Sequence, residues 1–359
     1  MTVQRKTRRI MVGDLAIGGG SPVSVQSMTS TDTADVFATT AQIRRLEAAG
    51  CDVVRVAVPD QKAAAAIRAI RDRIRIPLIA DIHFQHTLAI ASMENGADAI
   101  RINPGNLGGE EKTRRVVEAA RHHRVPIRVG VNSGSIEKDL LAKYGYPNAD
   151  DSSALIESAL RSVRLVEKYG WDQIKISIKS ADVLTTVNSY RQLAAATDYP
   201  LHIGVTEAGG LIAGTVKSSV ALGMLLGEGI GDTLRVSLTR DPVDEVRVGF
   251  ELLRALRLRE HGPELISCPT CGRTRIDLFA LAEEVERIVQ TMTSPLKVAV
   301  MGCPVNGPGE AKQADIGIAG GRGQGLIFKK GEVWKRVPEE QLLAEFTTEL
   351  RRMDSEFRS

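Results

Sequence analysis

The sequence predicts an α/β protein in which a (β/α)8 TIM barrel is followed by a smaller α+β domain. After a short amino-terminal segment, β-like apolar runs alternate with longer helical patterns, and Gly or Pro marks many boundaries. Eight such units fit within about 235 residues, the size of a (β/α)8 barrel. Strict alternation favours parallel strands with right-handed crossovers. A doubly wound open sheet is the alternative.

The eight predicted strands are apolar runs bounded by loop-forming residues. We expect them at 23–28, 52–58, 77–82, 98–103, 126–132, 173–178, 200–205 and 233–238. Helical patterns such as TTAQIRRLEAAG and ALIESALRSVRLVEKYG lie between them. A helix at 242–259 follows the last strand, so the barrel domain is expected to span residues 21–259.

Two further regions flank the barrel. Within residues 1–20, RRIMVGDLAIGG predicts a hairpin that turns at Gly13 and Asp14 and plugs the amino-terminal face of the barrel. After residue 259 the alternation breaks, and HGPELISCPTCGR is typical of irregular chain. The elements expected in the α+β domain, residues 260–359, are a helix at 276–291, strands at 296–301, 315–319, 326–330 and 333–337, and a final helix.

The composition excludes some classes of function. The 47 basic and 44 acidic residues give a net charge of +3, which does not support a dedicated nucleic-acid binder. No run approaches the ~20 apolar residues of a membrane span. The first residues, MTVQRKTRRI, are basic and polar and lack the apolar core of a signal peptide. We therefore expect a cytoplasmic protein.

Several predicted strands carry a cation between β-branched residues. In AIRIN, Arg101 lies between Ile100 and Ile102, and because side chains alternate along a strand, the isoleucines face the helices and the arginine faces the lumen. The other cations expected inside the barrel are Arg55, Arg128, Lys175, Lys179 and Arg235. The inward acids that the sequence suggests are Asp81 and Glu207. Since buried cations need counter-charges, this excess predicts a bound phosphate or diphosphate at the carboxyl ends of the strands.

Three cysteines of the carboxyl-terminal domain suggest a metal centre. Cys268 and Cys271 form a Cys-x-x-Cys pair, and Cys303 follows in a glycine-rich segment. A structural zinc site normally has four protein ligands, so three cysteines fit an iron–sulfur cluster better, with Glu310 as a possible fourth ligand. The remnant of a zinc ribbon is the alternative.

The segments SCPTCGR and MGCPVNGPGEAKQADIGIAGG closely resemble those of the bacterial 4-hydroxy-3-methylbut-2-en-1-yl diphosphate synthases of isoprenoid biosynthesis. VQSMTSTDTAD, VRVAVPD, ADIHF, IRINPGN, RVGVNSGS and VTEAGG are similar to the same family. The resemblance covers essentially the whole chain and corresponds to the shorter bacterial form.

This resemblance implies an oxidoreductase that opens the ring of 2-C-methyl-D-erythritol 2,4-cyclodiphosphate, with flavodoxin or ferredoxin as electron donor. It implies a [4Fe-4S] cluster on Cys268, Cys271, Cys303 and Glu310. It places diphosphate recognition on Arg55, Arg101, Arg128, Asn132 and Lys179. Glu207 would be the proton donor and Asp81 a second acid, while His202 either contacts the diphosphate or a water molecule or fills the lumen.

The order of the elements suggests how the active site is assembled. The helix after the eighth strand returns to the amino-terminal face of the barrel, opposite the expected anion site. We therefore expect a head-to-tail homodimer in which each cluster domain caps the barrel of its partner. The competing interpretations are a non-redox phosphate-binding barrel enzyme with a zinc-stabilised tail, an electron-transfer module similar to sulfite or nitrite reductases, and a protein that only binds its ligand.

Overall fold

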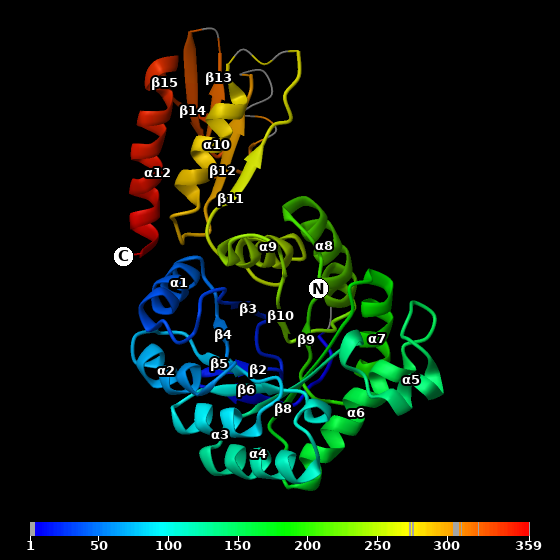
Figure 1. Ribbon diagram of the computed structural model, residues 1–359. Helices are drawn as coiled ribbons and strands as arrows, with labels where there is room; N and C mark the ends of the chain where they lie inside the picture. Colours follow the sequence, from blue (N-terminus) through cyan, green and yellow to red (C-terminus); the bar gives the residue numbers. More distant parts are fainter. Residues whose placement is uncertain are drawn as a thin grey trace. The chain divides into compact units, whose positions relative to one another are not determined.

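The computed structural model describes residues 4–272, 274, 276–303, 309, 311–321 and 323–358. The chain divides into two compact units, Met1–Arg259 and Glu260–Ser359. The first unit holds an eight-stranded parallel sheet with its helices, and the second holds a separate five-stranded sheet (Figure 1). Among the residues described, no helix is long and apolar enough to cross a bilayer.

The first unit is a (β/α)8 barrel. Its strands are β3 (Ser24–Met28), β4 (Val53–Ala57), β5 (Leu78–Asp81), β6 (Ala99–Ile102), β7 (Ile127–Asn132), β8 (Ile174–Lys179), β9 (His202–Ile203) and β10 (Thr233–Leu234). Neighbouring strands follow the order β8-β7-β6-β5-β4-β3-β10-β9. A parallel bridge between Ile176 and Leu201 brings β8 to the entry of β9 and so joins the two edges. The predicted barrel is confirmed, and the open doubly wound sheet is wrong.

Helices surround these strands (Figure 1). They are α1 (Val36–Ala48), α2 (Gln61–Arg71), α3 (His86–Glu94), α4 (Glu110–His123), α5 (Lys138–Tyr144), α6 (Ser153–Lys168), α7 (Val183–Ala196), α8 (Leu211–Gly227) and α9 (Pro242–Ala255). Aspartates fix several helix starts: the carboxylate of Asp60 accepts a hydrogen bond from the Ala63 amide at 2.9 Å, and that of Asp182 accepts one from Thr185 at 2.7 Å. Such caps satisfy amides that have no partner within the helix.

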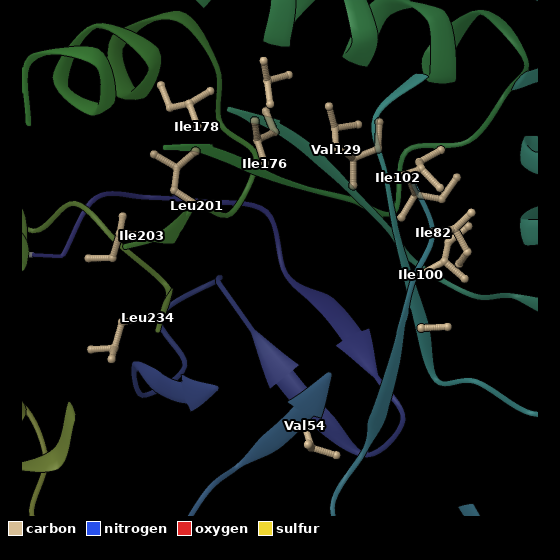
Figure 2. Close-up of a cluster of buried hydrophobic side chains, with 14 of the residues drawn as sticks. Val54, Ile82, Ile100, Ile102, Val129, Ile176, Ile178, Leu201, Ile203 and Leu234 are labelled. Atoms are coloured by element: carbon tan, nitrogen blue, oxygen red, sulfur yellow. The ribbon is translucent and has the colours of Figure 1, made fainter. Parts of the chain in front are cut away.

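The main core lies between the strands and the helices. Figure 2 shows aliphatic side chains such as Val54, Ile100, Val129 and Ile176, which point outward from the strands and are fully buried. The residues between them along each strand face the lumen, because side chains alternate. This packing fixes the direction of every lumen side chain.

The amino-terminal hairpin closes one end of the barrel with apolar side chains. β1 (Ile10–Val12) pairs antiparallel with β2 (Leu15–Ile17), and the chain turns at Gly13 and Asp14. The hairpin residues Ile10, Val12 and Ile17 cluster with Val53, Ile79 and Ala99. These last three stand at the starts of β4, β5 and β6, so the hairpin covers the amino-terminal ends of the strands.

The last two barrel strands are shorter than the sequence predicts. β9 and β10 have two residues each, whereas the apolar runs predict 200–205 and 233–238. Backbone pairing continues one step further, since the Arg235 amide donates to the Ile203 carbonyl oxygen at 3.0 Å. Beyond that point the segments after β9 and β10 are loops, which bring Thr206, Glu207 and Ser237 to the carboxyl end of the barrel.

The second unit is an α+β domain. Its elements are β11 (Glu264–Ser267), α10 (Leu278–Val289), β12 (Lys297–Met301), β13 (Ile316–Gly320), β14 (Gln324–Lys329), β15 (Glu332–Pro338) and α12 (Leu342–Arg358). β11, β12 and β13 are parallel, and β14 and β15 continue the sheet antiparallel. The expectation of irregular chain at HGPELISCPTCGR is wrong for Glu264–Ser267, which form β11. This strand is short and lies between Pro263 and Cys268, so its apolar pattern is weak.

Candidate active site

A chamber of about 220 Å3 at the carboxyl ends of the strands contains most of the predicted cations. Its cationic side chains are Arg55, Arg101, Arg128, Lys179 and Arg235. The remaining lining comes from Met28, Asp81, His83, Asn132, Ser177, Thr206 and Ser237. All eight strands or their following loops therefore contribute to one small space, as the alternation of side chains predicts.

The flanking isoleucines explain why Arg101 faces the chamber. Ile100 and Ile102 are fully buried in the outer core, which turns Arg101, 6% exposed, toward the lumen. Strand register then places Arg101 beside Asp81 on β5 and Arg128 on β7. The cations from adjacent strands are thereby held close together despite their repulsion.

Two glycines at inward positions make room for the long cationic side chains. A Cβ atom at Gly130 would lie 2.5 Å from Arg101 Nε, and one at Gly204 would lie 2.6 Å from Lys179 Nζ. Contacts this short do not occur between such atoms. The absence of a Cβ atom at Gly130 and Gly204 therefore leaves the space that Arg101 and Lys179 occupy.

Asp81 is the predicted acid that the structure places among the cations. Its carboxylate lies 3.4 Å from Arg55 Nε and 3.2 Å from Arg101 Nη1. Burial alone would raise the pKa of Asp81, but Arg55, Arg101 and Arg128 together lower it to about 2. Asp81 therefore stays ionised and holds two arginines in place.

Glu245 is a second buried acid, which the sequence analysis missed. It lies in the first turn of α9, and its carboxylate accepts hydrogen bonds from Nε and Nη2 of Arg235, each at 3.2 Å. Ser27 Oγ and the Leu238 amide also donate to it, at 3.1 and 3.0 Å. Because the residue belongs to a helix rather than a strand, strand alternation gave no signal for it.

Positive charge in the lumen still exceeds negative charge. Arg128 Nε and Nη1 and Lys175 Nζ are buried without a hydrogen-bond partner among the described residues. Burial, followed by repulsion from neighbouring cations, lowers the pKa values of Arg128, Lys175 and Lys179 well below their usual range. Burial also lowers the pKa of Arg55 to about 10, although Asp81 opposes this. An anion entering the chamber would relieve this repulsion.

A wider outer chamber of about 930 Å3 adjoins the inner one and shares His83, Asn132 and Thr206 with it. The sequence suggested that Glu207 is an inward acid among the cations. The structure instead places it, exposed, in the lining of this outer space. Its φ of 54° is in the left-handed region, which is uncommon for a residue other than glycine. Such backbone strain is frequent at functional sites.

His202 lies in the barrel lumen but lines neither chamber. Its side chain is fully buried, and both ring nitrogens are without a hydrogen-bond partner in the part of the chain that the structure describes. Burial, then Arg128 and Lys179, lower its pKa well below the usual value. An uncharged imidazole that fills the lumen fits this position better than a diphosphate contact.

The cysteines of the second unit follow neighbouring strands. Cys268 comes directly after β11, and its amide donates to the Val300 carbonyl oxygen on β12 at 3.0 Å. Cys303 is buried two residues beyond the end of β12, and Cys271 is exposed. Among the described residues, no three His, Cys, Asp or Glu side chains form a ready metal site. Glu310, the predicted fourth ligand, lies outside those residues.

Comparison with known proteins identifies the family. The GcpE TIM-barrel domain matches residues 7–250, and the GcpE protein C-terminal domain matches residues 264–352. This chain belongs to the GcpE family. The 4-hydroxy-3-methylbut-2-en-1-yl diphosphate synthase (flavodoxin) of Desulfotalea psychrophila is 72% identical over 357 residues, which cover 99% of this chain and 98% of the relative. The enzyme of the same name from Caldanaerobacter subterraneus subsp. tengcongensis is 58% identical, with 99% of both chains covered. The resemblance seen in the sequence is confirmed.

Solved structures at low identity show the barrel alone. The 7,8-dihydropteroate synthase of Vibrio fischeri aligns with a TM-score of 0.50 at 11% identity, covering 70% of this chain and 98% of its own. The type I 3-dehydroquinate dehydratase of Clostridium difficile gives 0.50 at 16%, with 70% and 98% covered. The first unit of this chain therefore has the same barrel fold as these two enzymes, which have different names.

Other residues that line this GcpE-family chamber were missed, among them His83 and Met28. His83 connects the two chambers, and its Nδ1 lies 3.4 Å from Arg101 Nη1 while its Nε2 lies 3.8 Å from Asp81. Burial lowers the pKa of His83, Asp81 opposes this, and Arg101 adds to it. Met28 ends β3 beside the arginines. The motifs ADIHF and VQSM contained both residues, but the sequence analysis assigned no role to either of them.

Proposed function

We propose that this chain catalyses the reductive ring opening and dehydration of 2-C-methyl-D-erythritol 2,4-cyclodiphosphate to 4-hydroxy-3-methylbut-2-en-1-yl diphosphate, with two electrons taken from flavodoxin. The observation that carries the proposal is a lumen whose cations exceed its carboxylates, in a chain with 72% identity to a synthase of this name. A diphosphate supplies the missing negative charge.

The inner chamber would hold the diphosphate. Arginine presents several donors in a planar fork, which suits phosphoryl oxygens. Arg128 lines this space together with Lys179 and Asn132, and two of its nitrogens have no partner among the described residues. Asp81 orients Arg55 and Arg101, and Glu245 orients Arg235, so the pairs are fixed before the ligand arrives.

The surroundings favour different roles for the two predicted acids. Asp81 has a pKa of about 2 and contacts two arginines, so we assign it to positioning rather than to proton donation. Glu207 is exposed in the outer chamber, beside Thr206, which also lines the inner one. We assign proton donation to Glu207, because it adjoins the anion chamber without pairing to its cations.

The cysteines are suited to an iron–sulfur cluster. The site offers three soft thiol ligands, and two of them follow neighbouring parallel strands. Three thiols fit an iron–sulfur cluster better than they fit a structural zinc site, which normally has four protein ligands. Cys268, Cys271 and Cys303 would hold a [4Fe-4S] cluster, with Glu310 as fourth ligand. When bound, such a cluster supplies electrons one at a time.

Metal analysis and turnover test this proposal. Protein purified without oxygen should contain about four irons and four sulfides per chain. It should convert the cyclic diphosphate in the presence of reduced flavodoxin. Cys303→Ser should lose iron, whereas Cys51→Ala, at a cysteine buried in the barrel core, should retain it. One zinc per chain and no iron would instead favour a non-redox barrel enzyme with a zinc-stabilised tail.

We further propose a head-to-tail homodimer with shared active sites. At the end of the barrel unit, the Arg259 guanidinium binds the Asp52 carboxylate at 2.5 and 2.7 Å and the Val23 carbonyl oxygen at 3.2 Å. Residues 23 and 52 precede β3 and β4, so the chain leaves the barrel at the end opposite the chamber. An exposed apolar stripe along α8, formed by Ile212, Val216, Val220 and Met224, offers a surface for self-association.

Mixed dimers test this assembly. Arg128→Ala and Cys303→Ala should each be inactive alone. If each active site combines two chains, co-assembled dimers should regain roughly a quarter of wild-type activity, since half of the dimers are mixed and each has one intact site. Mixed dimers without activity would contradict shared sites.

A further inference from the structure

The sulfur of Met28 lies between two arginines of the inner chamber. Met28 Sδ is 3.2 Å from Nε and 3.1 Å from Nη2 of Arg55, and 3.7 Å from Nη1 of Arg235. The strand order explains the arrangement, because β3 lies between β4, which carries Arg55, and β10, which leads into Arg235. Register places Met28 directly beside Arg55.

The chemistry of a thioether suits this position. Its sulfur is a weak hydrogen-bond acceptor without charge. A carboxylate in the same place would orient both guanidinium groups but would also neutralise them. The two arginines already have one carboxylate each, Asp81 for Arg55 and Glu245 for Arg235. A third acid would remove much of the charge that attracts an anion.

We propose that Met28 is a positioning residue for the anion: its sulfur holds Arg55 and Arg235 in their ligand-binding orientation while leaving their charge available to a phosphoryl group. This inference rests on the proposed function and extends it to a residue with no charge. An arginine that is already ordered loses less rotamer freedom when the ligand binds.

The side chain is placed where it affects the ligand. Met28 lines the inner chamber with both arginines, and the side chains of Arg55 and Arg235 are only 10% and 17% exposed. Neither guanidinium has open solvent around it in which to reorient. Without the sulfur, the guanidinium N–H groups of Arg55 and Arg235 would turn to other acceptors. The nearest ones are the carboxylates that they already contact.

Binding of inorganic pyrophosphate to the holoenzyme tests the proposal. Met28→Leu keeps the volume but removes the acceptor. It should weaken pyrophosphate binding, measured by calorimetry, about three- to tenfold, the effect of one lost hydrogen bond. KM for the cyclic diphosphate should rise by a similar factor with kcat unchanged, because the lost interaction is present in both ground and transition states.

Two further variants separate positioning from packing. Met28→Gln restores a neutral acceptor and should bind pyrophosphate within about twofold of wild type. Met28→Glu should weaken binding more than Met28→Leu does, because it adds a negative charge. The matched control is Met93→Leu, at a methionine buried in the outer core, which should leave binding unchanged. In an Arg55→Met background, the effect of Met28→Leu should shrink, since contacting residues are not additive.

The outcomes are distinguishable. If wild-type protein does not bind pyrophosphate, both the anion chamber and the role of Met28 are wrong. If wild-type protein binds it and Met28→Leu binds equally well, only the role of Met28 is wrong. Equal losses in Met28→Leu and Met28→Gln, with unchanged melting temperatures, would also overturn it, because the acceptor would then be irrelevant.

Discussion

The two ends of the barrel lumen differ in chemistry although the same strands build both. At the amino end, Val53, Ile79 and Ala99 pack against the hairpin. Two residues further along the same strands stand Arg55, Asp81 and Arg101, which line the anion chamber. Two residues along a strand correspond to a distance of about 7 Å. One strand thus contributes hydrocarbon to stability and charge to binding, as is usual for barrels whose loops carry the site.

The comparison is less sharp on the other half of the barrel. There the lumen positions nearer the amino end of β8, β9 and β10 are Lys175, His202 and Thr233. Their side-chain polar atoms are buried without a partner in the described part of the chain. Unpaired buried polar groups reduce stability. The difference teaches that this barrel devotes only part of its lumen to packing.

Removal of Arg128 should have the largest effect. Arg128→Met removes a guanidinium that lines the chamber and has two nitrogens without a partner among the described residues. It should reduce pyrophosphate affinity and kcat/KM by about a hundredfold or more. The free energy of unfolding should not fall, because an uncompensated cation disappears. Calorimetry and steady-state kinetics measure the first effect, and urea unfolding measures the second. Arg115→Met, at an exposed site on α4, is the control. An unchanged pyrophosphate affinity would show that the anion does not bind in the inner chamber.

At the opposite end, Ile79→Ala should affect stability instead. Ile79 is fully buried beneath the hairpin, and its truncation should lower the free energy of unfolding of the barrel by about 2–5 kcal/mol. KM should stay near the wild-type value under conditions where the variant is folded. A large change in KM without loss of stability would mean that the two ends are not separate in function.

Lys175→Met tests the polar half of the lumen. Lys175 is 1% exposed and its Nζ has no partner among the described residues, so the substitution should raise the free energy of unfolding by about 1–3 kcal/mol. Urea titration of both proteins measures the difference. A less stable variant would show that Lys175 has a favourable partner, such as a bound anion.

The smallest effect should be a pH dependence of stability. Burial, with Arg128 nearby, lowers the pKa values of Lys175 and Lys179 in the folded chain, whereas unfolded lysines titrate near 10.5. Between those values the unfolded chain binds protons that the folded chain has released, so stability should rise with pH. The slope cannot exceed about 1.4 kcal/mol per pH unit for each group. Unfolding measured at a series of pH values should give a shallower slope for Lys175→Met, and an identical slope would contradict this.

Sequence alone predicted those parts of the site that depend on strand alternation. Arg101 between two isoleucines could be placed in the lumen, and so could Arg55 and Arg128, because outward hydrocarbon identifies the inward face. Glu245 could not be found in this way, since it contacts Arg235 from a helix. The interaction of Met28 with two arginines depends on strand order across the barrel, which the pattern of one strand does not contain.

The hairpin also has a kinetic consequence. Because β1 and β2 fill the amino end of the lumen with side chains, molecules exchange with the chamber at the carboxyl end. Product must then leave by the path that the next substrate enters, and the two cannot pass each other in a chamber of about 220 Å3. The product keeps a diphosphate, the group for which the chamber is charged. Accumulated product should therefore compete with substrate, raising apparent KM without lowering the maximal rate.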